Sequence, residues 1–496
     1  MGEIAVTDLP IGENMDVLFP PGRVNSIART GGTEVDAAPV PVDGAWLAAT
    51  MTALVERHQV PGAQLAVHRG GVTVAVEVGE IEYGAGIPVT RETAFPVGSI
   101  TKAWTATLAM ILVADGDLEL DAPLDEYLPE LGDWGSQLTL GQLLSHTSGF
   151  ASSPETPDLF TLSLGRYVRE HCREQDLILA PGSGFSYSSR NYVLVGHLIE
   201  TITGMSWWEA VESILLRPLG VDPAAVVGPM QARCERPIAT GHSVNSALGR
   251  TRSVEQLLVP AEAPAGALAM SAVDLVALGL MHVGQGVAEL LPATYAERMR
   301  EAVPDADSFG LADGWGAGLA VFREGTTEWI GHDGNANGTS CYLRIDPASG
   351  CVVALTTNSN TGSYLWEELC AELGRANLPL GTGKADTSPR PTVGPPAQCL
   401  GRYCNGPTEY LVTAADDGGL CLAIGGELIA RLAFYDGWDF VLQDPVSGQG
   451  LHVGRFLRDP ITKQVEHLQI VGRRALRDRP STVPQPRSRA DSLSCV

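Results

Sequence analysis

Apolar residues recur at helical spacing in several stretches of this chain. In residues 46–58 nearly every third or fourth residue is apolar, and Pro61-Gly62 follows. This spacing predicts an amphipathic helix, and the proline and glycine predict its end. The same pattern predicts helices at residues 99–114, 191–203, 265–284 with Ser271 as a cap, and 366–376.

Alternation of apolar and polar residues predicts strands in two regions. Residues 64–67 and 72–78 flank His68-Arg69-Gly70-Gly71, which is typical of a hairpin turn. Further strands are expected at residues 93–97, 314–322, 327–332, 339–345 and 352–357. Helices beside an antiparallel sheet define the α+β class, so residues 45–380 are predicted to form one α+β domain.

Composition changes on both sides of this domain. Residues 1–44 are rich in Gly, Pro and Val and have little periodicity, which favours an N-terminal extension. Residues 381–396 have the Gly- and Pro-rich composition of a linker. Short alternating runs in residues 397–478 predict a small all-β domain, and the Pro-, Ser- and Arg-rich residues 479–496 predict a disordered tail.

Composition also limits the function. The 496 residues carry a formal net charge of −25, and 44% of them are hydrophobic. The negative charge argues against a nucleic acid or an anionic membrane as partner. The nine cysteines form no C-x-x-C pair, so neither a disulfide framework nor a metal site is indicated. Without a signal-like N-terminus or an apolar run of about 18 residues, we expect a cytoplasmic protein that needs no metal or cofactor.

The strongest candidate for chemistry is Ser99-Ile100-Thr101-Lys102, where a short apolar run ends and a long helical pattern begins. Three residues are nearly one helical turn, so Ser99 and Lys102 would lie on one face of the helix. A lysine amine beside a serine hydroxyl can help to remove the hydroxyl proton. The free N–H groups at the start of the helix would face a developing oxyanion. S-x-x-K alone is also common by chance, and Ser99 would then only cap the helix.

Two later stretches supply partners for Ser99. Tyr187 lies in Y-S-S, and a tyrosine between a lysine and an imidazole can carry a proton from the nucleophile to the leaving group. His332 opens H-D-G at the start of a strand-like segment. There Gly334 would let a strand approach an acyl group, and the Asn335 N–H would complete an oxyanion hole with that of Ser99.

In order and surroundings these stretches resemble the serine β-lactamase-like superfamily. The branch is that of class C β-lactamases, D-alanyl-D-alanine carboxypeptidases, family VIII esterases and penicillin-binding-protein-type thioesterases. The resemblance covers about residues 45–376 and rests on V-G-S-I-T-K-A-W-T-A-T at 97–107, L-L-S-H-T-S-G-F at 143–150, P-G-S-G-F-S-Y-S-S-R-N-Y-V-L-V-G-H-L-I-E at 181–200, A-P-A-G-A-L-A-M-S-A-V-D-L at 263–275 and G-H-D-G at 331–334. It implies an antiparallel sheet flanked by helices together with a helical lobe. The C-terminal domain is similar to the lipocalin-like β-barrel that follows some of these hydrolases.

The resemblance implies that Ser99 carries the acyl group, that Lys102 and Tyr187 form the acid–base system, and that His332 occupies the place of the lysine in K-T-G. Two departures bear on the substrate. Ser189 stands where Y-x-N has an asparagine that contacts the substrate amide, and its side chain makes fewer hydrogen bonds. His332 supplies no fixed cation for a substrate carboxylate, because imidazole is mostly neutral at pH 7. Both departures favour an ester, a thioester or an unusual amide over a penicillin or D-Ala-D-Ala.

Three further side chains are candidates near such a site. Trp315 lies beside glycines and is a candidate wall of an acyl pocket. Asp333 would orient His332, bind substrate or lie in a solvated loop. His146, in S-H-T-S-G, is a second candidate base, although the resemblance makes its segment a structural loop.

The sequence therefore predicts a serine hydrolase or acyltransferase that forms an ester at Ser99 and passes the acyl group to water, an alcohol or an amine. Its substrate would be a small-molecule or peptide acyl compound, and tailoring of specialised metabolites would suit an intracellular member. The first alternative is a β-lactamase or a D-amino-acid peptidase of the D-Ala-D-Ala type. The second is a catalytically silent binding or scaffold protein that keeps the fold. The acyl donor, the acceptor and the oligomeric state are left open.

Overall fold

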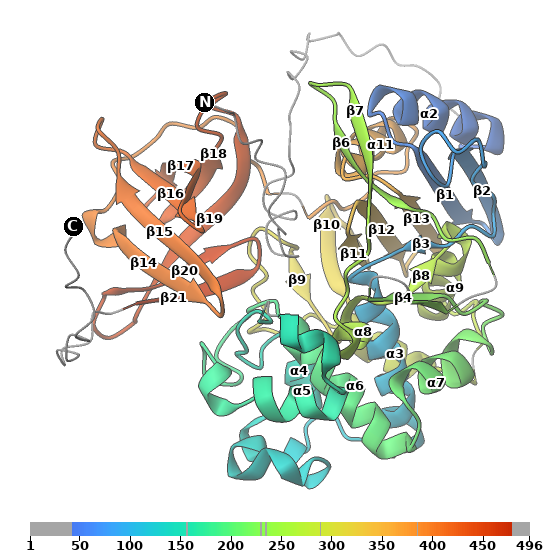
Figure 1. The fold of residues 1–496 in the computed structure, drawn as a ribbon, viewed down its shortest axis with the longest axis horizontal. Helices are drawn as coiled ribbons and strands as arrows, with labels where there is room; N and C mark the ends of the chain where they lie inside the picture. The colour runs from blue at the N-terminus through green and yellow to red at the C-terminus, as the bar shows by residue number, and fades with distance from the viewer. Residues whose placement is uncertain are drawn as a thin grey trace, which may run out of the picture.

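The computed structural model describes residues 42–154, 157–228, 231–233, 236–287, 289–383 and 385–478. The expectations for the extension up to residue 41 and for the tail from residue 479 lie outside these ranges. Within them, helices and antiparallel strands form an α+β region, and a separate all-β region follows in the chain (Figure 1).

A seven-stranded antiparallel sheet forms the centre of the α+β region, with strand order β2-β1-β13-β12-β11-β10-β9. Its strands are β1 (Gly62–Arg69), β2 (Val72–Gly79), β9 (Gly314–Trp315), β10 (Ala320–Glu324), β11 (Thr327–Ala336), β12 (Thr339–Asp346) and β13 (Cys351–Thr357). The pairing of β10 with β11 ends where Ala320 lies opposite Gly331. Among the described residues no strand therefore pairs with residues 332–336 on that side, and this part of β11 keeps a free edge.

Side chains alternate between the two faces of the sheet along each strand, and most of them are apolar, so both faces need cover. Helices supply it on each face. Leu65 and Leu355 belong to the core under α2 (Gly44–Arg57) and α11 (Gly362–Arg375). Ala66 and Ala354 belong to the opposite core, which contains α3 (Ile100–Asp115) and α9 (Ala272–His282). Residues 100–113 of α3 are all buried, so this helix is enclosed on every side, as a helix with few charged residues should be.

The rest of the α+β region is a helical lobe together with short two-stranded pieces, of which the β6–β7 hairpin lies beside α2 and α11 (Figure 1). The helices are α4 (Leu140–Leu144), α5 (Leu164–His171), α6 (Ser189–Thr203), α7 (Trp207–Ala210), α8 (Ala263–Gly266) and α10 (Ala293–Arg300). The short strands are β3 (Phe95–Pro96), β4 (Ala225–Val227), β5 (Gln231–Arg233), β6 (Gly241–Asn245), β7 (Arg250–Val254) and β8 (Ala269–Met270). Short 3-10 segments are η1 (Leu124–Glu126), η2 (Pro129–Gln137, kinked at Gly132), η3 (Pro157–Thr161), η4 (Glu174–Asp176), η6 (Pro260–Glu262) and, just before the barrel, η7 (Ala397–Cys399); η5 (Val211–Leu216) is a π-helix.

Two predicted elements are interrupted in the structure. The single helix expected at 265–284 is instead α8, β8 and α9, because β8 pairs with β3 and Ser271 caps the new start of α9 in a capping box with Asp274. The strand expected at 314–322 is broken between β9 and β10. There Gly318 has a φ of +83°, which suits a turn and not a strand. At 265–284, therefore, a tertiary strand pairing overrides the local helical pattern.

The C-terminal region is a closed barrel of eight antiparallel strands, β14 to β21. The strands are β14 (Gly401–Asn405), β15 (Thr408–Ala414), β16 (Leu420–Ile424), β17 (Glu427–Asp436), β18 (Asp439–Gln443), β19 (Gly450–Arg458), β20 (Val465–Ile470) and β21 (Arg473–Arg477). The barrel has a core of its own, which includes Phe434, Phe440 and Phe456. The predicted fold class, α+β followed by a small β-barrel, is confirmed; the exact limits of the linker and domains stay predictions.

Several hydrogen bonds join the barrel to the α+β region. The Ser152 N–H donates to Asn405 Oδ1 at 2.6 Å, and the Gly472 N–H donates to the Phe309 carbonyl at 2.9 Å. The second contact uses the β20–β21 turn, in which Val471 has a φ of +45°. A β-branched residue rarely adopts this conformation, so the turn is held in a strained shape where it meets the other region.

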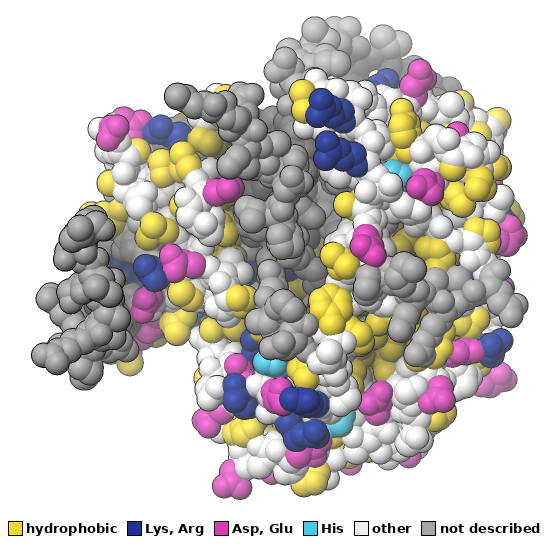
Figure 2. All heavy atoms as spheres, in the orientation of Figure 1, with side chains coloured by type: hydrophobic (Ala, Val, Ile, Leu, Met, Phe, Trp, Pro, Cys, Tyr) yellow, Lys and Arg dark blue, Asp and Glu magenta, His cyan; other side chains and the backbone are white. Residues whose placement is uncertain are grey.

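The surface in Figure 2 carries acidic and basic side chains interspersed over both regions. No helix among the described residues is long and apolar enough to cross a membrane. The seven cysteines in the described part of the chain are all free.

Candidate active site

Ser99 lies at the start of α3, directly before the buried helix. The Lys102 amine, one turn later, donates to Ser99 Oγ at 3.0 Å and to the Ala265 carbonyl at 2.9 Å. Lys102 is 1% exposed, so the second bond holds a buried amine in place beside the hydroxyl. The structure brings the two residues together as the helical spacing predicts.

Two glycines bring strand β11 against the turn that carries Ser99. A Cβ on Gly98 would lie 2.0 Å from the Asn335 carbonyl oxygen, and a Cβ on Gly334 would lie 2.0 Å from the Val97 carbonyl oxygen. Gly98 also has a φ of +49°. A side chain at either position would force the strand away from Ser99, so the glycines fix the distance between Ser99 and the free edge of β11.

Tyr187 precedes helix α6 and is 7% exposed. The Lys102 amine lies 5.1 Å from the centre of its ring. Among the described residues its hydroxyl makes no hydrogen bond to Ser99 or Lys102. The Tyr187 N–H donates to the Gly472 carbonyl of the barrel at 2.9 Å, so the barrel helps to hold the backbone of this residue.

His332 lies on β11 and is 2% exposed. Its Nδ1 lies 2.6 Å from the Asp333 carbonyl oxygen. A carbonyl only accepts, so Nδ1 carries the proton and Nε2 holds a lone pair, which has no partner among the described residues. Burial, and next the Lys102 amine, lower the pKa of His332 to about 3. The ring is therefore a neutral acceptor at pH 7, unlike the lysine of K-T-G.

This state of His332 predicts a pH dependence. In protein labelled with ¹⁵N-histidine, the His332 ring should stay neutral, with its proton on Nδ1, from pH 8 to pH 5. Its pKa is lower in the folded protein than in the unfolded chain, where it is about 6.5. The unfolded chain therefore binds a proton at His332 more readily than the folded protein does. The stability that the neutral ring contributes to the folded protein is fully present above about pH 6.5 and is lost as the pH falls towards 3. The spectrum of His332→Asn assigns the signals, and a His332 ring that titrates near pH 6.5 would contradict the prediction.

The predicted substrate-binding residues lie around this cluster. Ser189 is the first residue of α6 and is partly exposed, as is Asn335. Trp315 is 2% exposed, and its ring centre lies 5.7 Å from that of Tyr187 and 5.3 Å from that of His332. Trp315 therefore packs directly behind the two rings. The binding roles of Ser189, Gly334, Asn335 and Trp315 stay predictions.

Asp333 points away from the site. Its carboxylate forms an ion pair with Arg344 of β12, a residue with no exposed surface. The Arg344 guanidinium also donates to the Gly381 carbonyl at 2.7 Å and lies 3.5 Å from the centre of the Phe322 ring. Neighbouring residues on a strand face opposite sides of the sheet, so the His332 side chain faces the site and the Asp333 side chain faces the opposite side, where its ion pair with Arg344 holds the strand.

The structure adds Arg473, which no pattern in the sequence indicates. This residue opens β21 of the barrel, and its guanidinium carbon lies 5.2 Å from the centre of the Tyr187 ring. Among the described residues no carboxylate pairs with it. Arg473 therefore supplies a fixed positive charge beside Tyr187. No local motif marks it, because only the docking of the barrel brings it to the site.

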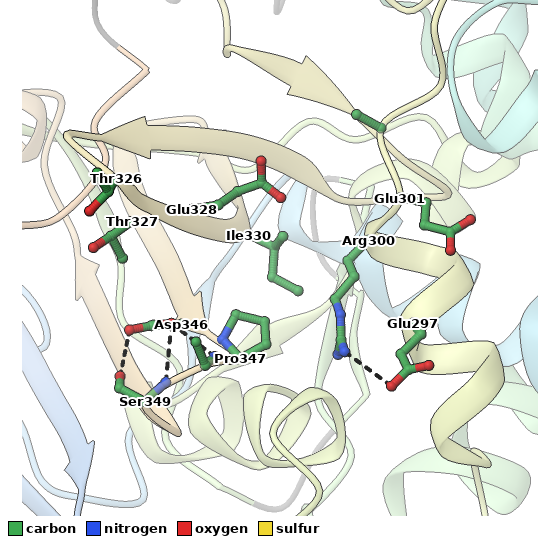
Figure 3. A pocket seen from close by; sticks show the side chains of 12 residues that line it. Glu297, Arg300, Glu301, Thr326, Thr327, Glu328, Ile330, Asp346, Pro347 and Ser349 are labelled. Carbon is green, nitrogen blue, oxygen red and sulfur yellow. Dashed lines mark hydrogen bonds and ion pairs between the residues drawn. The ribbon is translucent and has the colours of Figure 1, made fainter.

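A surface pocket of about 910 Å³ lies elsewhere and shares no residue with this cluster (Figure 3). Four carboxylates line it, from Glu297, Glu301, Glu328 and Asp346, with Arg300 among them. The Ser349 hydroxyl donates a hydrogen bond to Asp346 Oδ2 at 2.5 Å, so this carboxylate already has a partner. Within the described ranges, no group of three or more His, Cys, Asp or Glu side chains is placed to hold a metal ion.

A buried helix that opens on S-x-x-K against the free edge of an antiparallel sheet defines the serine enzymes with the β-lactamase/transpeptidase fold. The family model described as Beta-lactamase matches residues 47–366, and the chain belongs to this family. It is thus a serine hydrolase-type protein.

Known proteins similar to this chain support the same class. Penicillin-binding protein 4 of Amycolatopsis lactamdurans is 34% identical over 365 residues, which are 68% of this chain and 93% of that protein. Esterase EstB of Burkholderia gladioli is 29% identical over 374 residues, covering 64% of this chain and 92% of the esterase. The crystal structure of SurE matches with a TM-score of 0.79 at 39% identity and covers 88% of this chain and 98% of SurE. A second SurE structure, with D-Leu, has a TM-score of 0.76.

Proposed function

We propose that this protein is an acyl-transferring serine enzyme that works through an ester at Ser99. The observation that carries the proposal is the 3.0 Å contact between the Lys102 amine and Ser99 Oγ, with the amine fixed by the Ala265 carbonyl. Ser99 Oγ attacks the carbonyl carbon of the substrate, and its proton passes to the Lys102 and Tyr187 system. The leaving group takes a proton as its bond to the carbonyl carbon breaks, which leaves the acyl-enzyme.

The second half of the reaction reverses these steps with a new nucleophile. Water, an alcohol or an amine attacks the acyl carbon, gives its proton to the same system, and restores the Ser99 hydroxyl. The Ser99 N–H, which has no acceptor among the described residues, and the Asn335 N–H are proposed to stabilise the oxyanion in both halves. His332 would contribute as a neutral acceptor for an N–H or O–H group of the substrate.

The proposed substrate is an ester, thioester or amide of an amino acid or peptide. Two features support this choice. Arg473 offers a guanidinium beside Tyr187 for a free carboxylate on the leaving or the accepting part of the substrate, because the acyl carboxyl itself is esterified or amidated; His332, as a neutral ring, offers no such charge. SurE, the neighbour at 39% identity, has a structure with D-Leu, an amino acid with a free carboxylate. We propose tailoring of specialised metabolites as the biological setting. Free thiols favour a reducing compartment such as the cytoplasm.

A β-lactamase or a D-amino-acid peptidase is the second candidate. The D-Leu structure of SurE and the relative named as a penicillin-binding protein favour it. Ser189 in the place of the amide-binding asparagine, and the neutral His332, weigh against it.

One experiment separates these functions. Purified protein is incubated with a fluorophosphonate, a p-nitrophenyl ester or a penicillin, and its intact mass is followed with time. We expect a stable phosphonyl adduct on Ser99 and an acyl adduct that forms and turns over with the ester but not with the penicillin. Turnover of the penicillin would favour the second candidate. If no reagent modifies Ser99, both enzyme functions are wrong and a silent scaffold is the remaining reading.

A further inference from the structure

His146 is a buried residue that the proposed reaction does not use. It lies in the turn that follows α4, has no exposed surface, and has a φ of +57°. Only a few per cent of residues other than glycine adopt a positive φ, so such a conformation persists where the surroundings enforce it. His146 is hydrogen-bonded to the residues directly before and after Tyr187.

Three consecutive peptide N–H groups fix the backbone at Tyr187, and His146 accepts two of them. The Ser186 N–H donates to the His146 carbonyl at 3.0 Å. The Ser188 N–H donates to His146 Nδ1 at 3.2 Å. Between them, the Tyr187 N–H donates to the Gly472 carbonyl. His146 therefore holds the chain immediately before and immediately after the tyrosine.

Hydrogen bonds fix the His146 imidazole in the tautomer in which Nδ1 can accept the Ser188 N–H. Nδ1 also accepts from Asn191 Nδ2 at 2.9 Å, and Asn191 Oδ1 accepts from the Ser148 hydroxyl at 2.5 Å. Because both partners of Nδ1 are donors, this atom carries the lone pair and the proton is on Nε2. Burial, and next the Lys102 amine, lower the pKa of His146 well below its usual value, so the ring remains a neutral acceptor.

The ring itself also touches the tyrosine. The centres of the His146 and Tyr187 rings are 4.3 Å apart, with 34° between their planes. The Lys102 amine lies 5.1 Å from the same phenol ring. The position of the phenol relative to Lys102 therefore depends on the residue that fixes its backbone and contacts its ring.

We propose that His146 is a positioning residue for Tyr187, and that its Nδ1 lone pair and carbonyl oxygen keep the phenol beside Lys102 and Ser99. The inference rests on the proposed role of Tyr187 in proton transfer. His146 acts only through the tyrosine; it transfers no proton and touches no substrate. The segment treated as a structural loop in the sequence thus controls the geometry of the acid–base system.

A pair of substitutions tests the acceptor. His146→Phe keeps a flat ring but removes the lone pair, whereas His146→Asn keeps an acceptor oxygen near the place of Nδ1 and suits the positive φ. For hydrolysis of p-nitrophenyl butyrate we expect His146→Phe to lower kcat by at least about tenfold with little change in KM, because a displaced catalytic group slows the chemical step. His146→Asn should stay within about threefold of the wild type. If His146→Asn is as slow as His146→Phe, the proposed role of the acceptor is wrong.

A double-mutant cycle separates positioning from a general loss of structure. When Tyr187→Phe is already present, adding His146→Phe should change kcat by less than about twofold, because its effect runs through the missing hydroxyl. Equal effects in both backgrounds would overturn the inference. His282→Phe, an equally buried histidine on α9, is the matched control and should lower thermal stability without this loss of kcat.

The outcome also distinguishes this inference from the proposed function. If the wild type forms no Ser99 adduct, the proposed function fails and the inference fails with it. If the wild type forms the adduct and His146→Phe reacts at the same rate, only the inference is overturned.

Discussion

Replacing Ser99 with alanine is expected to abolish the mass adducts with the fluorophosphonate and the p-nitrophenyl ester. It should also lower kcat/KM for the ester by about 10⁴-fold or more, the scale found when a covalent nucleophile is removed. The fold should persist, because the Ser99 side chain makes no capping hydrogen bond to α3. Intact-mass spectra, ester turnover and a thermal unfolding curve measure the three effects.

Ser213→Ala is the matched control for this variant. Ser213 is an exposed serine in η5, and its hydroxyl bonds only within the helical lobe. We expect its adducts and turnover to equal those of the wild type. An adduct that persists in Ser99→Ala would mean that another residue is the nucleophile, and peptide mapping would locate it.

Because the proposed substrate carries a free carboxylate, we expect D-leucine to bind this protein beside Arg473, and replacing Arg473 with alanine to weaken that binding by about 100-fold. A guanidinium that pairs with a carboxylate through charge-assisted hydrogen bonds contributes about 2–5 kcal/mol when the partner is withdrawn from water. The effect should depend on the carboxylate. D-leucinamide, which lacks that charge, should bind the wild type weakly and should lose little more in the variant. Calorimetric titration of both ligands into both proteins measures the difference.

Two variants sharpen this test. Arg473→Lys keeps the charge but loses the planar pair of donors, so it should recover only part of the affinity. Arg458→Ala removes another barrel arginine, which stacks on Trp438 at 4.6 Å, and should leave the preference for D-leucine unchanged. If Arg473→Ala still prefers D-leucine over its amide to the same degree, the carboxylate is bound elsewhere.

The parts of the site that the sequence predicts best are those set by local geometry. Ser99 and Lys102 are three residues apart on one helix, so their contact follows from the helical repeat alone. Tyr187 and His332 are far apart in the chain. Only the resemblance to a family with the same order of motifs places them in one site, because the spacing of residues along the chain does not predict which distant strand and helix lie side by side.

Residues whose roles depend on packing between distant parts could not be predicted. Arg473 reaches Tyr187 only because the barrel docks against the α+β region. The sequence offers His146 only as a second candidate base in a loop, because the hydrogen bonds that it accepts from residues 186 and 188 depend on the three-dimensional packing. The split of residues 265–284 has the same origin, because the pairing of β8 with β3 overrides a helical pattern.

The hydrogen bond between the Tyr187 N–H and the Gly472 carbonyl ties the barrel to the proposed acid–base system. Local unfolding of the barrel would remove one of the three backbone hydrogen bonds that fix Tyr187 and would leave the two to His146. The two regions are therefore coupled through the backbone of Tyr187. If the barrel were exchanged for that of a relative, the new barrel would need a turn that accepts the Tyr187 N–H. It would also replace Arg473, so the preference for the substrate would change while Ser99 and Lys102 stayed the same.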